Sequence, residues 1–255
     1  MITHGSLFSG IGGIDLGFEW AGIETVWQVE SESFCQRVLE KNFPRATRFS
    51  DVRECGKHNL PRVNVVSGGF PCQDVSAAGQ MAGLNGRRSR LYWQLVRIVR
   101  EVRPDWVLLE NVARLLHTEG DAVLVQMEAA GYNCWPIILG AKEIGATHIR
   151  KRAWILCRRA DASKNLRSAE LGISHRKAAE RALRQAKEAW TRRLDELAAA
   201  NGPVGADAYS RIRRECHGIP HWLDRCGALG NAVVPQIPML FGFFIRAIEN
   251  AEVKP

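Results

Sequence analysis

A cysteine in a conformationally restricted turn is the residue of this chain best placed to do chemistry. Cys72 follows Pro71, whose ring fixes its own φ and removes a backbone donor, and two adjacent glycines, Gly68 and Gly69, come shortly before. The β-branched run 63–66 ahead of the glycines predicts a buried strand. Because ligands bind beyond the carboxyl ends of strands in open α/β sheets, Cys72 is a candidate nucleophile. A lone cysteine near a strand end is more often a small buried hydrophobe, so the assignment depends on its surroundings.

A glycine-rich loop near the N-terminus predicts a ligand-binding turn. A short apolar strand at 5–8 leads into Ser9-Gly10-Ile11-Gly12-Gly13, and the helix that follows ends at Gly22. Such glycines let backbone amides and the helix N-terminus face the polar groups of a ligand. The spacing departs from Gly-x-Gly-x-x-Gly because Asp15 occupies the place of the third glycine, which disfavours NAD or FAD. By itself, the loop is equally compatible with a plain tight turn.

Two carboxylates follow the next predicted strands. Glu30 comes directly after the strand 25–29 and about twenty residues after Gly10, where an acid can bind both hydroxyls of a cofactor ribose. Asp51, in the segment 48–52, falls at a further strand terminus, within reach of an adenine amino group. Each acid alone is more often solvated, but the pair together with the glycine loop favours a nucleoside cofactor.

A third acid and two arginines are expected at the same edge of the sheet. Glu110 follows the apolar strand 105–109, and desolvation there favours its protonated form, which suits an acid or a hydrogen-bond donor. The alternative is a glutamate that caps the next helix. Arg150 and Arg152 precede the strand 153–157, and since alternate residues of a strand share a face, both can point into one site.

These motifs, in this order, resemble those of the cytosine-C5 DNA methyltransferases. The matching blocks are Phe8-Ser9-Gly10-Ile11-Gly12-Gly13, Glu30, Asp51, Pro71-Cys72-Gln73, Glu110-Asn111-Val112, Arg150-Lys151-Arg152 and Gly230–Gln236. Three departures are visible. Ser50 replaces a usual glycine, Ser31-Glu32 varies the usual pattern after the ribose-binding acid, and His148 replaces a usual glutamine.

The resemblance implies a role for each of these residues. Cys72 attacks C6 of a cytosine, Glu110 acts at the N3 edge of the base, and Arg152, with Arg150, holds its carbonyl edge or its phosphate. S-adenosylmethionine is the implied cofactor, and the residues that would bind it are Phe8, Gly10, Ile11, Gly12, Gly13, Glu30, Ser31, Asp51, Val52, Pro71, Asn231, Ala232 and Val233. The residues that would bind the substrate are Gln73, Ser76, Gly79, Arg87, Arg88, Arg90, Asn111 and Val112. The target cytosine must leave the duplex, because a stacked base cannot present C6 to a thiol.

The fold implied by the resemblance is α/β. We expect a Rossmann-like sheet of the S-adenosylmethionine-dependent methyltransferase type, with helices on both faces. Residues 1–158 would form the catalytic and cofactor-binding domain, 159–227 a short, reduced target-recognition segment, and 228–255 a C-terminal return to the catalytic domain. The recognition segment is short for this family, so the target sequence is not predicted.

Composition sets the class of protein and of partner. A net charge of +8 and a pI near 9.4 favour an anionic partner, here a DNA duplex. The seven cysteines are odd in number and include no Cys-x-x-Cys pair, which argues against a disulfide framework and against a metal site. No signal peptide and no apolar run long enough for a bilayer are seen, so a cytoplasmic monomer with no membrane contact is expected, in a restriction-modification system if a cognate endonuclease exists.

Three other functions remain open from the residues. An RNA cytosine-C5 methyltransferase acting on tRNA would use the same Pro-Cys-Gln chemistry. A non-catalytic DNA-binding relative is disfavoured by the intact Cys72, Glu110 and Arg152. A NAD-dependent oxidoreductase is disfavoured by the glycine spacing.

Overall fold

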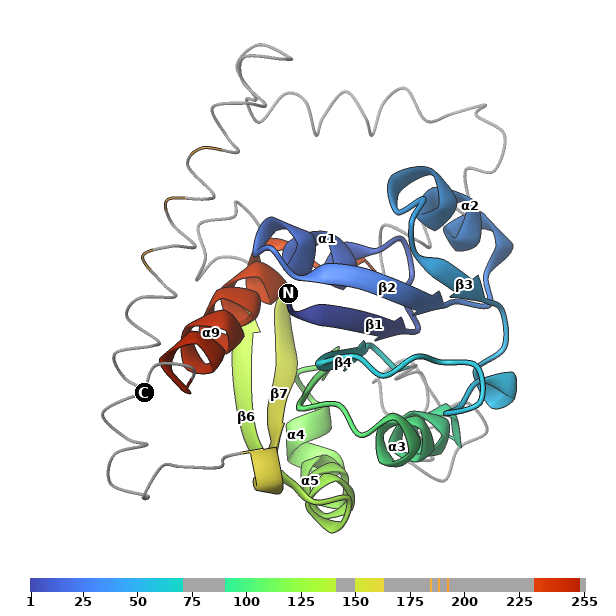
Figure 1. The fold of residues 1–255 in the computed structure, drawn as a ribbon. Helices are drawn as coiled ribbons and strands as arrows, with labels where there is room; N and C mark the ends of the chain where they lie inside the picture. The colour runs from blue at the N-terminus through green and yellow to red at the C-terminus, as the bar shows by residue number, and fades with distance from the viewer. Residues whose placement is uncertain are drawn as a thin grey trace.

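The computed structural model describes residues 1–70, 90–140, 150–162 and 232–252, with single helical residues at 184, 188 and 192. Within them a seven-stranded sheet has the order β3-β2-β1-β4-β5-β7-β6 (Figure 1). The strands are β1 Thr3–Leu7, β2 Glu24–Val29, β3 Thr47–Phe49, β4 Val65–Gly68, β5 Trp106–Val112, β6 Tyr132–Gly140 and β7 Lys151–Arg159. The helices are α1 Gly13–Trp20, α2 Ser33–Asn42, η1 Val52–Glu54, α3 Arg90–Val102, α4 Leu115–Thr118, α5 Gly120–Ala129, η4 Ala160–Ala162 and α9 Gln236–Glu252.

The sheet is parallel from β3 to β5 and reverses direction only at β7. Strand β1 pairs in parallel with both β2 and β4, and the chain passes outward from β1 in both directions. Strand β7 lies antiparallel between β5 and β6. The carboxyl ends of β1, β2, β4 and β5 therefore meet at one edge, where open α/β sheets bind ligands. The predicted mixed α/β sheet with helices on both faces is confirmed.

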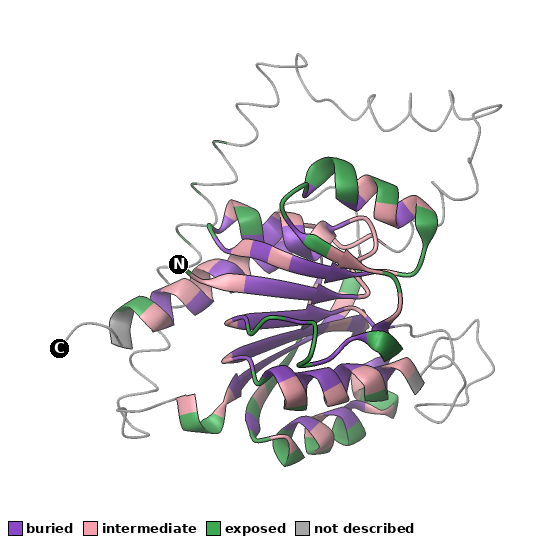
Figure 2. Cartoon of the chain, turned by 45° about the vertical axis from the view of Figure 1, so that its right-hand side comes forward, coloured by how far each residue is buried: buried purple, intermediate pink, exposed green. Residues whose placement is uncertain are grey.

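Two hydrophobic cores lie on opposite faces of this sheet (Figure 2). On one face, Tyr92 and Leu95 of α3 and Met127 of α5 pack with alternate residues of β4, β5 and β7. On the other face, Phe18 of α1 and Phe241 of α9 pack with the remaining alternate residues of the same strands. Because side chains alternate across a strand, the near-continuous apolar runs in the sequence serve both cores.

The strand boundaries differ from the sequence prediction in two places that matter. Strand β4 is Val65–Gly68 rather than 63–66. The Asn64 side chain accepts a hydrogen bond from the backbone amide of Thr3, and pairing with β1 starts only at Val65. Strand β5 continues through Glu110 to Val112, since its antiparallel partner β7 already begins at Lys151. Glu110 is thus the fifth residue of a strand and not a helix cap. The strands predicted at 5–8, 25–29 and 153–157 lie within two residues of β1, β2 and β7.

Arg97 of α3 directs its side chain toward η1. Its guanidinium donates to the backbone oxygens of Val52 and Cys55, at 3.1 and 2.8 Å, and to Glu101 at 2.9 Å. It therefore ties α3 to η1. A charged side chain on a helix can donate hydrogen bonds to backbone carbonyl groups of another element, and the hydrophobic periodicity of the helix does not predict such contacts.

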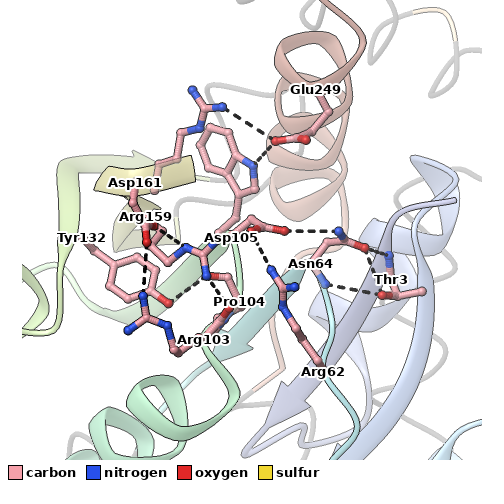
Figure 3. A network of polar contacts seen from close by, with 12 residues as sticks. Thr3, Arg62, Asn64, Arg103, Pro104, Asp105, Tyr132, Arg159, Asp161 and Glu249 are labelled. Carbon is pink, nitrogen blue, oxygen red and sulfur yellow. Dashed lines mark hydrogen bonds and ion pairs between the residues drawn. The ribbon is translucent and has the colours of Figure 1, made fainter. Parts of the chain in front are cut away.

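A polar network ties the strands together at the edge opposite their carboxyl ends (Figure 3). Asp105, just before β5, accepts from Arg62 at 3.1 Å and from Arg159 at 3.0 Å. Trp106 donates to Glu249 of α9 at 2.7 Å, and Tyr132 donates to the oxygen of Pro104 at 2.8 Å. These contacts anchor β4, β5, β6, β7 and α9 at one end of the sheet. The other end remains available for a site.

Within the described residues, neither a membrane-crossing helix nor a metal-binding cluster is found. No described helix is both apolar and long enough to cross a bilayer. No group of three His, Cys, Asp or Glu in the described ranges could hold a metal ion. No disulfide joins any of the four cysteines that the structure describes.

Close contact between α1 and the segment 233–252, which includes α9, depends on glycines. A Cβ on Gly17 would lie 2.2 Å from the backbone oxygen of Pro235, and one on Gly13 would lie 2.5 Å from that of Val233. On α9, a Cβ at Gly242 would lie 2.6 Å from Ala21. The C-terminal helix therefore approaches the N-terminal one at backbone distance, which brings 232–235 close to the glycine loop.

Gly17→Ala tests this contact. Alanine normally stabilises a helix relative to glycine, but here its methyl group meets backbone that must move, so we expect the free energy of unfolding to fall by about 1–3 kcal/mol. Urea denaturation measures the change. Gly120→Ala in α5 is the control, because its Cβ would meet nothing closer than 3.5 Å and should leave the protein as stable or more stable. Equal stability of Gly17→Ala and the parent would contradict the packing argument.

Candidate active site

A cavity of about 830 Å³ lies at the carboxyl ends of β1, β2, β4 and β5. One part is bordered by the glycine loop and the acids Glu30 and Asp51, and another by Glu110 and Arg152. The predicted site residues that line it are Phe8, Gly10, Ile11, Gly13, Glu30, Ser31, Asp51, Val52, Glu110, Asn111, Val112, Arg150, Arg152, Ala232 and Val233. The topology thus brings together residues that are up to 225 positions apart in sequence, from Phe8 to Val233.

The glycines of the first loop have different structural roles. Gly10 has a φ of 55°, and a Cβ there would meet nothing within 4 Å, so the backbone faces open space beside the cavity. Gly12 has a φ of 85° and does not line the cavity, because it packs against Phe43 at the end of α2. The structure thus gives Gly12, predicted as a cofactor contact, a turn and packing role.

Phe8 also adopts the left-handed conformation, with a φ of 55°. This is rare for a bulky side chain and costs backbone energy, and such strain concentrates at functional sites. The conformation places Phe8 on the cavity wall, with its ring partly buried against the core.

Glu30 is held by backbone donors at the cavity wall. One carboxylate oxygen accepts from the amide of Gly10 at 2.7 Å, and the other accepts from the amide of Glu32 at 2.8 Å. Each oxygen keeps a further lone pair for a ligand. The first contact also fixes the glycine loop relative to the end of β2.

Asp51 is more exposed and is engaged by its neighbour Arg53. The Arg53 side chain donates to both carboxylate oxygens, at distances from 2.6 to 3.0 Å, and the Arg53 amide donates as well. These hydrogen bonds hold the pKa of the Asp51 carboxyl below its usual range. Asp51 is therefore a fixed acceptor at the cavity, as an adenine amino group would require.

Glu110 is a buried acid facing two arginines. Arg152 Nε lies 3.1 Å from Glu110 Oε1, and only 12% of the Glu110 side chain is exposed. Burial raises the pKa of the Glu110 carboxyl, and the positive charges of Arg152 and Arg150 offset part of that effect. Gly69 leaves room for the acid, since a Cβ there would lie 3.2 Å from Glu110 Oε2. The predicted shift toward the protonated form is confirmed in direction.

Asn111 uses its side chain to hold the neighbouring strand end. Its amide nitrogen donates to the backbone oxygen of Phe70 at 3.1 Å, and its amide oxygen accepts from Val112. Asn111 therefore fixes the position at which the chain leaves β4. It was predicted to bind substrate, but its side chain is committed to these backbone groups.

Several predicted site residues lie outside the part of the chain that the structure describes. They are Pro71, Cys72, Gln73, Ser76, Gly79, Arg87, Arg88 and Asn231. Arg90 begins α3, but its side chain is outside the described set.

Several residues that line the cavity were not among the predicted site residues, and two of them have side chains suited to contact a ligand. Phe34, in the first turn of α2, and Arg53, in η1, both border the cavity. Each follows a predicted ligand-binding acid by a few positions, Glu30 and Asp51 respectively. That proximity is the signal that could have identified them.

Comparison with known proteins places these observations in a family. Residues 2–212 match the model of the C-5 cytosine-specific DNA methylase family. The chain is 36% identical over 160 residues to the type II methyltransferase M.FnuDI of Fusobacterium nucleatum, covering 61% of this chain and 46% of that protein. It is 38% identical over 158 residues to M.CviJI of a Paramecium bursaria Chlorella virus, covering 61% and 42% respectively. The chain spans about half the length of the curated relatives it matches.

Solved structures share the fold. A structure described as a DNA modification methyltransferase of an E. coli prophage aligns with a TM-score of 0.55 and 26% identity, over 66% of this chain and 50% of that one. The S. pombe Dnmt2 methyltransferase aligns with a TM-score of 0.54 and 17% identity, over 66% and 57% respectively, which supports the fold alone. The family model matches most of the sequence, and Glu30, Asp51 and Glu110 line one cavity. The chain therefore belongs to the C-5 cytosine-specific DNA methylase family.

Proposed function

We propose that this chain transfers a methyl group from S-adenosylmethionine to C5 of cytosine in DNA, with Cys72 as the nucleophile. The observation that carries the proposal is the single cavity with two chemically different ends. Glu30 and Asp51 offer acceptors at one end, while Glu110 and Arg152 offer a buried acid and a cation at the other. Phe70 lines the same cavity, and Cys72 follows it by two positions in the sequence.

The residues present fit the proposed cofactor. Because Gly10 has no side chain, the space beside it is open to a ligand. The two carboxylate oxygens of Glu30 are held by backbone amides in positions from which they can accept hydrogen bonds from two ribose hydroxyls. Asp51 supplies an acceptor for an adenine amino group, and the backbone of 232–233 closes the other side of the loop. When bound, S-adenosylmethionine supplies the methyl group.

The chain's own residues would activate the base. The Cys72 thiolate adds to C6, which makes C5 nucleophilic, and loss of the C5 proton with expulsion of the thiolate later restores the ring. Glu110, in its protonated form, donates at N3 and stabilises the charge that develops as sulfur adds. Arg152 orients Glu110, and with Arg150 it can hold the carbonyl edge or phosphate of the nucleotide.

A duplex DNA substrate is supported by charge and by family. The net charge of +8 favours a polyanion, and the matched family is named for DNA methylation. The target base would be flipped out, with the basic run Arg87–Arg90 closing behind it. In this proposal 1–158 form the catalytic domain, 159–227 contact the target, and 228–255 return to the catalytic domain. The packing of α9 on α1 supports the last assignment.

Methyl transfer to duplex DNA is the direct test. With labelled S-adenosylmethionine, we expect incorporation into duplex DNA, none with Cys72→Ser, and a covalent adduct with duplexes that carry 5-fluorocytosine at the target, because that base cannot lose its C5 substituent. Incorporation into tRNA instead of DNA would replace the proposed substrate. Parental activity in Cys72→Ser would refute the nucleophile.

Glu110→Gln tests the acid. Because burial raises its pKa, Glu110 stays protonated to a higher pH than a free glutamate, and its acid form is lost as pH rises through that pKa. We therefore expect kcat to drop by about a hundredfold or more in Glu110→Gln, with the alkaline decline that belongs to this group removed. Glu128→Gln on α5 is the control. A pH–rate profile that keeps the same alkaline limb in Glu110→Gln would exclude this role.

Glu30→Ala tests the ribose-binding acid. Loss of charge-assisted hydrogen bonds should weaken S-adenosylmethionine binding by about tenfold or more in calorimetry, and the fall in kcat at saturating cofactor should be smaller. Glu40→Ala, on the exposed side of α2, should leave the Kd unchanged. Equal Kd values for Glu30→Ala and the parent would rule the contact out.

A further inference from the structure

A layer of buried polar side chains lies between the sheet and α1. These side chains are almost wholly inaccessible, which is unusual at the centre of a domain. They come from β1, β2, β4 and α1, and they are His4, Ser6, Asp15, Thr25, Gln28 and Ser67. His4 contacts Thr25 at 3.0 Å and Ser67 at 2.8 Å, so the layer is connected across three strands.

Asp15 joins α1 to this layer. Its Oδ2 accepts from the Ser6 hydroxyl at 3.1 Å, and its Oδ1 accepts from Gln28 Nε2 at 2.9 Å. The side chain is fully buried, and no ion pair to it is found among the described residues. A carboxylate in the first turn of α1 is thus bonded to the two strands that flank the glycine loop.

The partners of Asp15 are adjacent to the cofactor-binding residues. Ser6 precedes Phe8 by two positions on β1, and its backbone oxygen accepts from the Ser9 hydroxyl at 3.3 Å. Gln28 precedes Glu30 by two positions on β2. Asp15 therefore fixes the start of the loop, the helix after it and the strand that carries Glu30 in one rigid arrangement.

A contribution to folding stability does not explain why a carboxylate, Asp15, occupies this buried position. Burial raises the pKa of Asp15 to about 6, so the group is mostly ionised at neutral pH and its desolvation opposes folding. Because the folded-state pKa lies above the ordinary value of 3.8, folding stability from this group falls as pH rises from about 4 to about 6. A neutral side chain of the same shape would remove this cost.

We propose that Asp15 is a positioning residue that holds the glycine loop and Glu30 in the geometry that binds S-adenosylmethionine. The inference rests on the proposed function and adds to it a residue that does not line the cavity. Ionised Asp15 accepts from Ser6 and Gln28 at once. An asparagine can accept only through one oxygen, so one of these restraints is weakened.

The other groups that face Asp15 leave the pH dependence interpretable. Burial lowers the pKa of His4 to about 3, so His4 remains neutral above pH 5. Thr25, Gln28 and Ser67 carry no charge. Glu19, one turn further along α1, has a raised pKa and is the main competing group, while Arg246 of α9 binds the oxygen of Ala21 at the far end of α1.

The test measures cofactor affinity and stability together in Asp15→Asn. We expect the Kd for S-adenosylmethionine at pH 7.5 to rise about tenfold, while Tm stays equal to the parental value or rises. Between pH 7.5 and 5.5, affinity should fall in the parent as Asp15 takes up its proton, and it should stay flat in Asp15→Asn. Glu19→Gln, in the same helix but exposed, should keep both the parental Kd and the parental pH dependence.

Each of the following results would overturn the inference. A parental Kd in Asp15→Asn shows that the loop does not depend on this carboxylate. A Tm that falls in parallel with affinity shows a structural role only. If the parent itself binds no S-adenosylmethionine, the proposed function fails as well, which the parental titration identifies separately. If Asp15→Asn does not fold, Ser6→Ala is the alternative variant, because it removes one of the same hydrogen bonds. We expect Ser6→Ala to weaken S-adenosylmethionine binding about threefold with an unchanged Tm. An unchanged Kd in Ser6→Ala would equally overturn the inference.

Discussion

The reversal of strand order at β1 is the constraint on which the rest of the structure depends. From β1 the chain moves outward to β2 and β3, then returns to β4 on the other side and moves outward again to β5. The connections leave on opposite sides of this point, so the carboxyl ends of β1 and β4 are not covered by a crossing helix. The glycine loop, Glu30 and Asp51 follow strands that end there, Glu110 lies within β5 near its carboxyl end, and one cavity results.

The polar contacts at the amino ends of the parallel strands differ from those at their carboxyl ends. At the amino end of β5, Asp105 is paired with arginines, and Trp106 binds Glu249, so α9 and four strands are fixed together. At the carboxyl end, Glu30, Asp51 and Glu110 face the cavity, and each is held by a partner at its own strand end or on a neighbouring strand. The contacts at the amino end therefore fix the scaffold, while those at the carboxyl end position acidic groups toward the cavity.

Buried acids in this protein are stabilised in two different ways. Glu110 lies beside Arg152 and Arg150, so the positive charge of these arginines offsets part of the rise in its pKa that burial causes. Asp15 accepts hydrogen bonds from the neutral groups of Ser6 and Gln28, and burial raises its pKa to about 6. The first arrangement suits a group that exchanges a proton with a ligand, and the second suits a fixed acceptor within the scaffold.

The sequence by itself determined the family, the order of the motifs and the strand that carries each acid, because apolar runs, glycines and strand-terminal carboxylates are local signals. It predicted Glu110 directly after a buried strand, whereas the structure places it within β5, and it predicted the direction of the shift in the Glu110 pKa. Only the tertiary structure decided that β5 extends through Glu110, that Gly17 allows the close approach of α9, and that Asp15 bonds to Ser6. The physical reason is that these features depend on neighbours far away in the sequence, whose distance and direction no local pattern records.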